Sequence, residues 1–272
     1  MMPKCAHEHS ATDHTRAYMR LTRCFVAVPL ASDTTVSLSA AASAHLAKVL
    51  RLRVGAALTL FDGRSGEFEA EIVALERDGV RVRVGAHRVL ERESPVAVTL
   101  LQCLARGERM DWIVQKATEL GAVSIVPVIS EHSVVRLDES AAQRRQQHWQ
   151  SVAISACEQC GRNRVPAIKT PAAFERACLE AHSAGARLLL EPEGAQSLAS
   201  VVNALAASTS VSVLIGPEGG LSAQELAIAQ RHGFIGCHLG PRILRAETAP
   251  LAALAALQAL LGDFGERKAA RN

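Results

Sequence analysis

The sequence predicts an α/β protein with a mostly parallel sheet, preceded by a smaller β-rich domain. From residue 96 onward, short β-branched runs alternate with segments of helical periodicity, which is typical of a parallel sheet with helices on both faces. Before residue 90 the pattern differs: Val80, Val82 and Val84 alternate with arginines, as in a strand with one buried face. A chain of 272 residues is long enough for two such domains.

The first domain is expected over residues 20–92, and a polar link ending in Pro95 separates it from the second. Glycines at positions 63 and 66 indicate a turn between two strands of a hairpin. The expected elements, in order, are a strand at 23–28, a short helix at 40–50, hairpin strands at 58–61 and 67–73, and a strand around 80–84.

The second domain is expected over residues 95–265, with tails at 1–19 and 266–272. The first tail is polar and is expected to be disordered, although its three histidines could instead bind a metal. The expected strands of the domain are 96–104, 123–129, 187–190, 211–215 and 235–239. The expected helices are 109–120, 140–160, 172–183, 198–207, 222–232 and a last one that ends near Leu261.

Composition limits the class of protein. Hydrophobic residues make up 49% of the chain and aromatic residues only 3%, so the core must be aliphatic. A formal net charge of +3 is too small to indicate a nucleic-acid-binding protein by itself. No apolar run reaches the roughly 18 residues that a membrane span requires. The seven cysteines come without a signal peptide, which predicts free thiols in a reducing, cytoplasmic location.

The main candidate for a ligand site lies where the last two expected strands end. Gly216 follows the first of these strands and Gly240 follows the second. Ser222 and Glu225 have the spacing of a capping box, so a helix should start soon after the first loop. Neighbouring strand ends of this kind form a crevice lined by backbone amides. The alternative is an ordinary strand–helix–strand connection whose glycines serve tight turns.

Common nucleotide and metal motifs do not explain these loops. No Lys-Ser or Lys-Thr pair follows the glycines, which excludes a Walker phosphate loop, and the dinucleotide pattern G-x-G-x-x-G is absent. The pair Cys157 and Cys160 could indicate a zinc or redox site. No second cysteine pair or paired histidines complete a zinc site, however, and the motif ends a helix instead of opening one. The residues alone therefore leave the ligand unnamed.

Six longer motifs extend over most of the chain, about residues 20–263. They are HLAKVLRLRVG (45–55), FDGRSGEFEAEI (61–72), LARGERMDWIVQKATELGA (104–122), ACEQCGRNRVP (156–166), IGPEGGLSAQE (215–225) and LGPRILRAET (239–248). Together they resemble the RsmE family of 16S ribosomal RNA (uracil-N3) methyltransferases. One departure is Pro250, where the family more often has alanine, and proline is tolerated in a first helical turn.

The resemblance implies a fold and an activity. The fold is a SPOUT-type, trefoil-knotted, mostly parallel sheet domain preceded by a small, PUA-like β-barrel that binds RNA. General rules of chain connection would favour an unknotted topology, so the threading of the chain after residue 239 is expected only from the resemblance. The implied activity is methylation of N3 of a uridine in 16S rRNA, with S-adenosylmethionine as cofactor, the 30S ribosomal subunit as substrate and a homodimer as the functional unit.

The resemblance also implies site residues. No metal is expected. The cofactor-binding residues are Leu190, Glu191, Ile215, Gly216, Glu218, Gly219, Gly220, Leu239, Gly240, Ile243, Leu244 and Thr248. Thr248 could instead cap the last helix, which is the role we favour. The RNA-binding residues are Arg23, His45, Lys48, Arg51, Arg53, Arg109, Arg162 and Arg164. On charge alone, those around 45–53 could equally form a solvated helix face.

The predicted catalytic residues follow from the chemistry of uracil. Removing the N3 proton leaves an anion that a guanidinium can stabilise, and a carboxylate can accept the proton. We expect Arg245, Arg106 and Glu158 to serve in these ways, although Arg245 could instead bind carbonyl groups at a helix start. Two other functions stay open: a non-enzymatic RNA-binding or ribosome-assembly protein, and a methyltransferase acting on another nucleotide.

Overall fold

The structure is a computed structural model that describes residues 21–64, 66–77, 79–133, 138–181, 184–204 and 210–265. The tails expected at 1–19 and 266–272 lie outside these residues. Within the described residues, no helix is long and apolar enough to span a membrane.

The N-terminal domain is built on a five-stranded sheet with the strand order β1-β3-β4-β5-β2. Its elements are β1 (Arg23–Phe25), β2 (Thr35–Ser37), α1 (Ala40–Ala44), the π-helix η2 (His45–Val49), β3 (Ala57–Phe61), β4 (Glu67–Glu76) and β5 (Gly79–Arg88). The three alternating valines of β5 are buried, as predicted. The helix expected at 40–50 is confirmed in part, because its second half widens into the π-helix η2.

The C-terminal domain contains an eight-stranded sheet in which every pairing between described strands is parallel. Its order is β11-β13-β10-β12-β6-β7-β8, with β9 also pairing to β7. The strands are β6 (Ala97–Cys103), β7 (Ala122–Ile129), β8 (Ala167–Ile168), β9 (Ala172–Ala173), β10 (Ala186–Leu190), β11 (Gln196–Ser197), β12 (Ser210–Ile215) and β13 (Ile235–His238).

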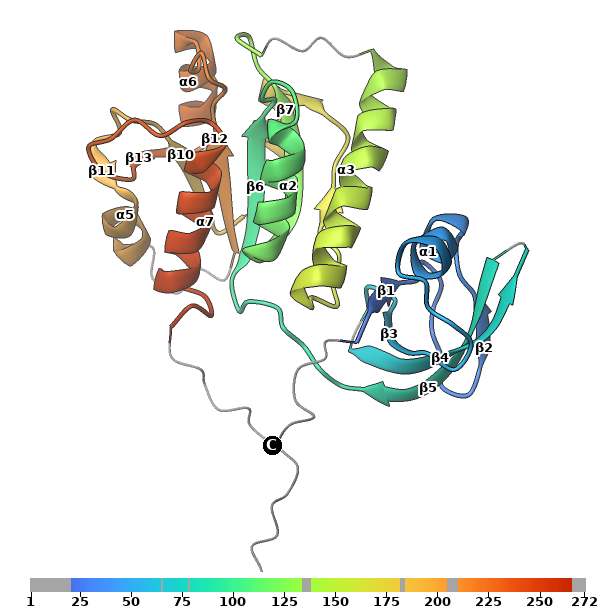
Figure 1. Ribbon diagram of the computed structural model, residues 1–272. Helices are drawn as coiled ribbons and strands as arrows, with labels where there is room; N and C mark the ends of the chain where they lie inside the picture. The colour runs from blue at the N-terminus through green and yellow to red at the C-terminus, as the bar shows by residue number, and fades with distance from the viewer. Residues whose placement is uncertain are drawn as a thin grey trace, which may run out of the picture.

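Helices cover both faces of this sheet, as the alternating pattern predicts (Figure 1). They are α2 (Arg109–Glu119), α3 (Glu139–Cys160), α4 (Phe174–Glu180), α5 (Leu198–Ala204), α6 (Ala223–Arg231) and α7 (Thr248–Leu260). One apolar core joins the sheet to α2, α3, α5 and α7, and a second joins its other face to α4 and α6. The expected helix at 172–183 is shorter than predicted, because its first two residues pair with β7 as β9.

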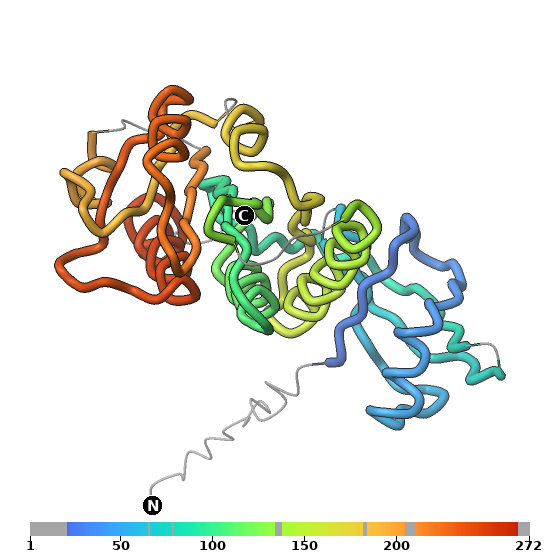
Figure 2. The backbone as a smooth tube through the Cα atoms, turned by 90° about the horizontal axis from the view of Figure 1, so that it is seen from above, coloured from blue at the N-terminus to red at the C-terminus, as the bar shows by residue number. Residues whose placement is uncertain are grey.

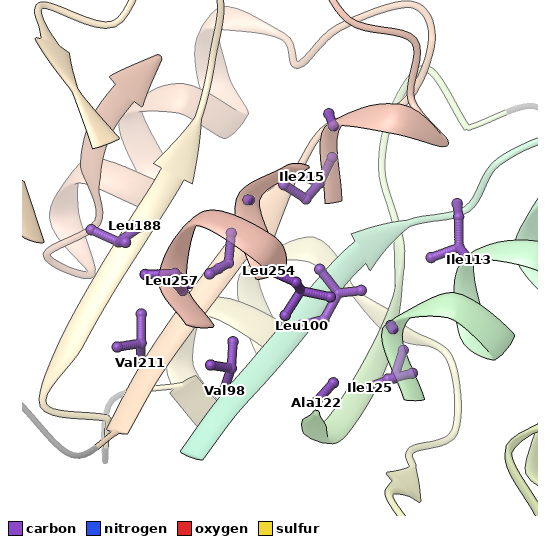
Figure 3. Close-up of a cluster of buried hydrophobic side chains, with 14 of the residues drawn as sticks. Val98, Leu100, Ile113, Ala122, Ile125, Leu188, Val211, Ile215, Leu254 and Leu257 are labelled. Carbon is purple, nitrogen blue, oxygen red and sulfur yellow. The ribbon is translucent and has the colours of Figure 1, made fainter. Parts of the chain in front are cut away.

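The larger core shows how strand alternation divides the two faces. Leu100 of β6 points toward α7, where Leu254 and Leu257 are fully buried against the sheet (Figure 3). Its neighbour Leu101 belongs to the core on the opposite face. Removing such a side chain from water contributes roughly 1.5–3 kcal/mol, so these buried aliphatic side chains contribute strongly to holding both helical layers on the sheet.

Strand β13 is the last strand in the chain but lies inside the sheet, between β10 and β11. The segment that joins β10 to β11 lies directly on β13: the amide of Glu191 donates to the carbonyl of Cys237 at 3.0 Å. A Cβ atom on Gly194 would meet the backbone of Cys237 at 2.7 Å, so only glycine fits there. The chain therefore leaves β13 beside an earlier loop, and its passage through that loop stays a prediction.

The start of α6 confirms the predicted capping box. The hydroxyl of Ser222 accepts from the amide of Glu225, and the carboxylate of Glu225 accepts from the amide of Ser222 at 2.9 Å. The other carboxylate oxygen of Glu225 accepts from the amide of Glu131 at 2.8 Å and so ties α6 to the loop after β7. The expected cap by Thr248 is wrong: α7 begins at Thr248, follows Glu247 and has no side-chain cap.

The two domains lie side by side along α3. Figure 2 shows the N-terminal domain in blue on one side of α3, while β13 and α7, in orange and red, lie at the far side of the molecule. The N-terminal domain contacts the C-terminal end of α3 through β1.

Candidate active site

Three loops at the carboxyl ends of neighbouring strands enclose a cavity of about 710 Å³. They follow β10, β12 and β13, and the side chain of Arg109 from α2 completes the wall. All the residues that the sequence predicted for a cofactor line this cavity, with the exceptions of Gly219 and Thr248. The parallel sheet places these strand ends together because its strands all run in one direction.

Much of the cavity wall is apolar. Leu190, Ile215, Leu239 and Leu244 contribute aliphatic surface from all three loops. Ile243 lies at the rim and is 84% exposed, which is unusual for a large aliphatic side chain. The cavity can therefore enclose a flat, apolar group, and Ile243 is placed to cover it.

Two glycines of the loops have backbone conformations that other residues rarely adopt. Gly220 has a φ of 72° and Gly240 a φ of 108°, so a side chain at either position would be strained. Gly216 is different, because its φ is ordinary but a Cβ atom would lie 3.3 Å from the Cγ atom of Leu221. The glycines thus shape the cavity. The alternative that they serve only tight turns applies to Gly220 and Gly240, but not to Gly216.

Glu218 joins the loop after β12 to the start of α2. Its Oε1 atom accepts from the guanidinium of Arg109 at 2.6 Å and from the amide of Arg106 at 3.3 Å. Burial tends to raise the pKa of Glu218, but the backbone donors and the charge of Arg109 outweigh it, and the pKa is lowered. Glu218 therefore stays ionised and fixes the position of Arg109.

Two other carboxylates of the cavity lack this support. Burial and the neighbouring charge of Glu193 raise the pKa of Glu191. The Oε2 atom of Glu247 is buried without a hydrogen bond, and only a long contact of 3.9 Å links it to Arg109. Such an unpaired acceptor can receive a hydrogen bond from a bound molecule.

Cationic groups surround the opening of the cavity. Arg242 and Arg245 line it and are exposed, and the Arg106 side chain is exposed beside it. Within the part of the chain that the structure describes, none of these three guanidiniums has a hydrogen bond or an ion pair. Sequence reasoning missed Arg242, although it lies only three residues before Arg245 in the same loop.

Glu158 does not belong to this site, and its predicted catalytic role is wrong. Its carboxylate accepts from the amide of Phe25 in the N-terminal domain at 3.0 Å and lines a different cavity. Burial raises its pKa. The nearby Arg162 donates to the carbonyl of Ala122, the first residue of β7. This region therefore lies at the amino ends of the strands, whereas the cavity lies at their carboxyl ends.

Two predicted RNA-binding residues are also corrected. Arg162 is only 4% exposed, and its guanidinium donates hydrogen bonds to the carboxylate of Glu93 and to two backbone carbonyls. The side chain of Arg23 is 11% exposed and is paired with Glu67 and Asn163. Both guanidiniums are held inside the protein by these contacts, so neither is available to an RNA phosphate while the contacts exist.

The remaining predicted RNA-binding residues are accessible. His45, Lys48, Arg51 and Arg53 are all exposed on one segment of the N-terminal domain. Arg164 is exposed and pairs with Glu91 at 2.8 Å, while Arg109 lies in the cavity wall. Contact of these residues with RNA stays a prediction.

Cys157 shows no sign of a reactive thiol. Burial raises the pKa of Cys157 to about 12, so its thiol stays protonated at neutral pH. Among the described residues, no group of three or more His, Cys, Asp and Glu side chains is arranged to hold a metal ion.

Comparison with known proteins defines the class. Residues 92–258 match the model of an RNA methyltransferase domain, and residues 38–85 match that of an RNA methyltransferase PUA domain. The fold is accordingly a SPOUT-type methyltransferase domain preceded by a PUA-like domain.

Individual relatives narrow this class to one family. A Legionella pneumophila protein, described as a methyltransferase and solved with bound SAM, is 36% identical, with a TM-score of 0.85 over 90% of this chain and 99% of that one. The ribosomal RNA small subunit methyltransferase E of Neisseria gonorrhoeae, bound to S-adenosylmethionine, is 38% identical, with a TM-score of 0.82 over 90% and 100%. The enzyme of the same name from Buchnera aphidicola (Schizaphis graminum) is 32% identical over 90% of this chain and 98% of its own length. The chain belongs to the ribosomal RNA small subunit methyltransferase E family.

Replacing Arg109 with methionine should raise the pKa of Glu218 toward its ordinary value. The folded-state pKa of Glu218 is now below the unfolded one, so the pair stabilises the protein at neutral pH and this contribution is lost as the pH falls through the folded-state pKa. Carbon-13 NMR titration of the carboxyl group measures the change. Arg231→Met, on the surface of α6, is the control, and an unchanged Glu218 titration in R109M would contradict the assignment.

Proposed function

We propose that the protein transfers the methyl group of S-adenosylmethionine to N3 of a uridine in small-subunit ribosomal RNA. The observation that carries this proposal is the convergence of three strand ends on one cavity, in a chain whose relatives are ribosomal RNA small subunit methyltransferases E. Two of its structural neighbours hold S-adenosylmethionine.

The cavity fits S-adenosylmethionine in size and chemistry. Its volume of about 710 Å³ lies within the range of roughly 300–1,000 Å³ that is usual for small-molecule sites. The aliphatic walls suit an adenine ring, which Ile243 would cover. The unpaired oxygen of Glu247 would accept a hydrogen bond from an amino or hydroxyl group, and the carboxylates would favour the net positive charge of the cofactor.

The residues around the cavity supply positioning and charge. Bound S-adenosylmethionine supplies an electrophilic methyl group, so no strong nucleophile is needed from the protein. The protein must hold the uracil N3 in line with that methyl group and exclude competing water. As N3 loses its proton to a carboxylate of the cavity, directly or through a water molecule, negative charge develops on the uracil oxygens. The guanidinium of Arg245, assisted by Arg242 or Arg106, would stabilise this charge.

RNA would reach the site as part of the 30S ribosomal subunit. The exposed segment His45–Arg53 offers cationic side chains for phosphate contacts. The target uridine must be unpaired or turned out of its helix before its N3 edge becomes accessible. Acting on ribosomal subunits would place the protein in the cytoplasm.

A homodimer is the proposed functional unit. Trp112 of α2 and Leu260 of α7 are each more than 40% exposed, and these two helices pack against each other on one face of the domain. Phe264, which follows α7, is 52% exposed. Exposed apolar side chains on one face of a domain are typical of a surface that a second copy covers.

The activity is tested with 30S subunits from a strain that lacks this methyltransferase. Tritium from labelled S-adenosylmethionine should be transferred to the 16S rRNA, and digestion with mass spectrometry should place the methyl group on N3 of a single uridine. Absence of transfer, or a methyl group on a carbon atom or a ribose, would reject the proposal. Wild-type 30S subunits, already modified, are the control.

Gly216→Val should weaken cofactor binding by about 10- to 100-fold, because overpacking of a filled site costs roughly 1–3 kcal/mol. A Cβ atom there already approaches Leu221 at 3.3 Å, and the two methyl groups of valine would crowd the cavity. Calorimetry with S-adenosylhomocysteine measures the affinity. Ala227→Val, at an exposed position of α6, should bind normally, and normal binding by G216V would argue against this cavity.

Arg245→Ala should reduce methyl transfer by about 100-fold, the effect typical of losing a donor to a developing anion. Cofactor affinity should change less, because this guanidinium is exposed at the opening of the cavity and makes no hydrogen bond or ion pair with other described residues. Single-turnover rates on 30S subunits separate the two quantities. Arg231→Ala is the control for loss of a surface charge, and an unchanged rate in R245A would remove the role assigned to Arg245.

A further inference from the structure

The contact between the two domains is made by polar groups. Among the described residues, the apolar core of the N-terminal domain and the two cores of the C-terminal domain share no side chain. Domains joined without a large apolar interface are expected to move relative to each other. The orientation of the N-terminal domain therefore depends on directed hydrogen bonds and ion pairs.

Arg23 is the centre of this contact. One end of its guanidinium pairs with Glu67 of β4, and the other donates to the Oδ1 atom of Asn163 at 2.6 Å. The guanidinium carbon lies 4.8 Å from the centre of the Phe61 ring. Arg23 thus joins three strands of the N-terminal domain to the loop that follows α3.

Asn163 and Arg92 extend the contact to the link between the domains. Asn163 is fully buried, and its Nδ2 atom donates to the carbonyl of Leu90 at 2.7 Å. Arg92 bridges the carboxylate of Glu67 at 3.3 Å and the carbonyl of Gly161 at 2.8 Å. We call Arg23, Glu67, Arg92 and Asn163 the domain clamp.

The clamp is better suited to fixing an orientation than to adding stability. Taking a buried ion pair out of water costs nearly as much as its attraction returns, whereas its hydrogen bonds tolerate only a narrow geometry. Burial opposes ionisation of Glu67, but Arg23 and Arg92 outweigh it and lower its pKa, so the pair stays charged. A planar guanidinium with two separate acceptors also resists rotation.

The clamp lies far from the cavity. It surrounds the loop at 161–163, and Arg162 in that loop bonds to the start of β7, whereas the cavity lies at the opposite ends of the strands. Strand β7 has 8 residues, which at about 3.3 Å each corresponds to roughly 25 Å. The clamp residues therefore cannot touch the reacting atoms bound in the cavity of the same subunit.

We propose that the domain clamp holds the N-terminal domain in the one orientation from which bound RNA presents its target nucleotide to a methyl-transfer cavity, which makes Arg23, Glu67 and Asn163 positioning residues. This proposal rests on the proposed function. The cationic segment His45–Arg53 is part of the domain that the clamp holds. A rotation of about 5° acting over roughly 20 Å displaces the RNA by ~2 Å, and misplacement by ~1 Å can slow a reaction about 100-fold.

The test compares two ion pairs of the same domain. The double variant Arg23→Met with Glu67→Leu replaces the buried pair by apolar side chains of similar size, a change that often preserves stability. The matched control, Arg83→Met with Glu71→Leu, removes an exposed pair between β5 and β4. Asn163→Leu is a second variant in case the double variant does not fold. It removes only the hydrogen bonds that Asn163 makes with Arg23 and with the carbonyl of Leu90.

Each variant is measured in three ways. With 30S subunits, the clamp variants should lose about 10- to 100-fold in kcat/KM, while their affinity for S-adenosylhomocysteine by calorimetry stays at the wild-type value. The distance distribution between spin labels on β5 and α6 should broaden in the clamp variants and stay narrow in the control.

Three results would overturn the proposal. Clamp variants with the kcat/KM of the control would show that orientation does not limit transfer. A parallel loss of cofactor affinity would show general damage to the fold. An unchanged label distance would show that other contacts set the orientation. Inactivity of the wild-type protein on unmodified 30S subunits would instead reject the proposed function, and the label distances would still test the clamp.

Discussion

The insertion of β13 between β10 and β11 is the constraint on which the rest of the C-terminal domain depends. Parallel pairing on both sides brings the end of the last strand level with the ends of β10 and β12. The loop at 239–247 must then close over those ends before α7 returns to the face formed by β12 and β6. The close approach at Gly194 is what allows the earlier connection to lie against β13 at all.

Arginines have different roles at the amino and the carboxyl ends of the strands, and the role depends on whether the side chain is buried or exposed. At the amino ends of the strands, Arg162 is buried and Arg23 is largely covered, and both guanidiniums are paired with carboxylates and with other oxygen acceptors. At the carboxyl edge, Arg242 and Arg245 are exposed beside an apolar cavity. A paired guanidinium organises the protein, whereas an exposed one keeps its donors for a ligand.

The sequence predicted what local chemistry determines. The capping box at Ser222, the glycine loops and most of the cavity wall follow from patterns a few residues long. The roles of Arg23, Glu158 and Arg162 could not be predicted in this way, because their partners lie 40 to 140 positions away in the chain. A motif also shows that residues belong together without showing at which end of the strands they lie, so the motif around Glu158 does not reveal that this residue lies away from the cavity.

The exposed Ile243 has a thermodynamic consequence. An exposed aliphatic side chain that a bound ligand covers is removed from water on binding, which gives the association a negative heat-capacity change. S-adenosylhomocysteine carries the same adenosine as the methyl donor, so it would bury the same surface and gain the same hydrophobic contribution. This contribution therefore does not distinguish the two forms of the cofactor, which differ at the sulfur atom, where loss of the methyl group removes the positive charge.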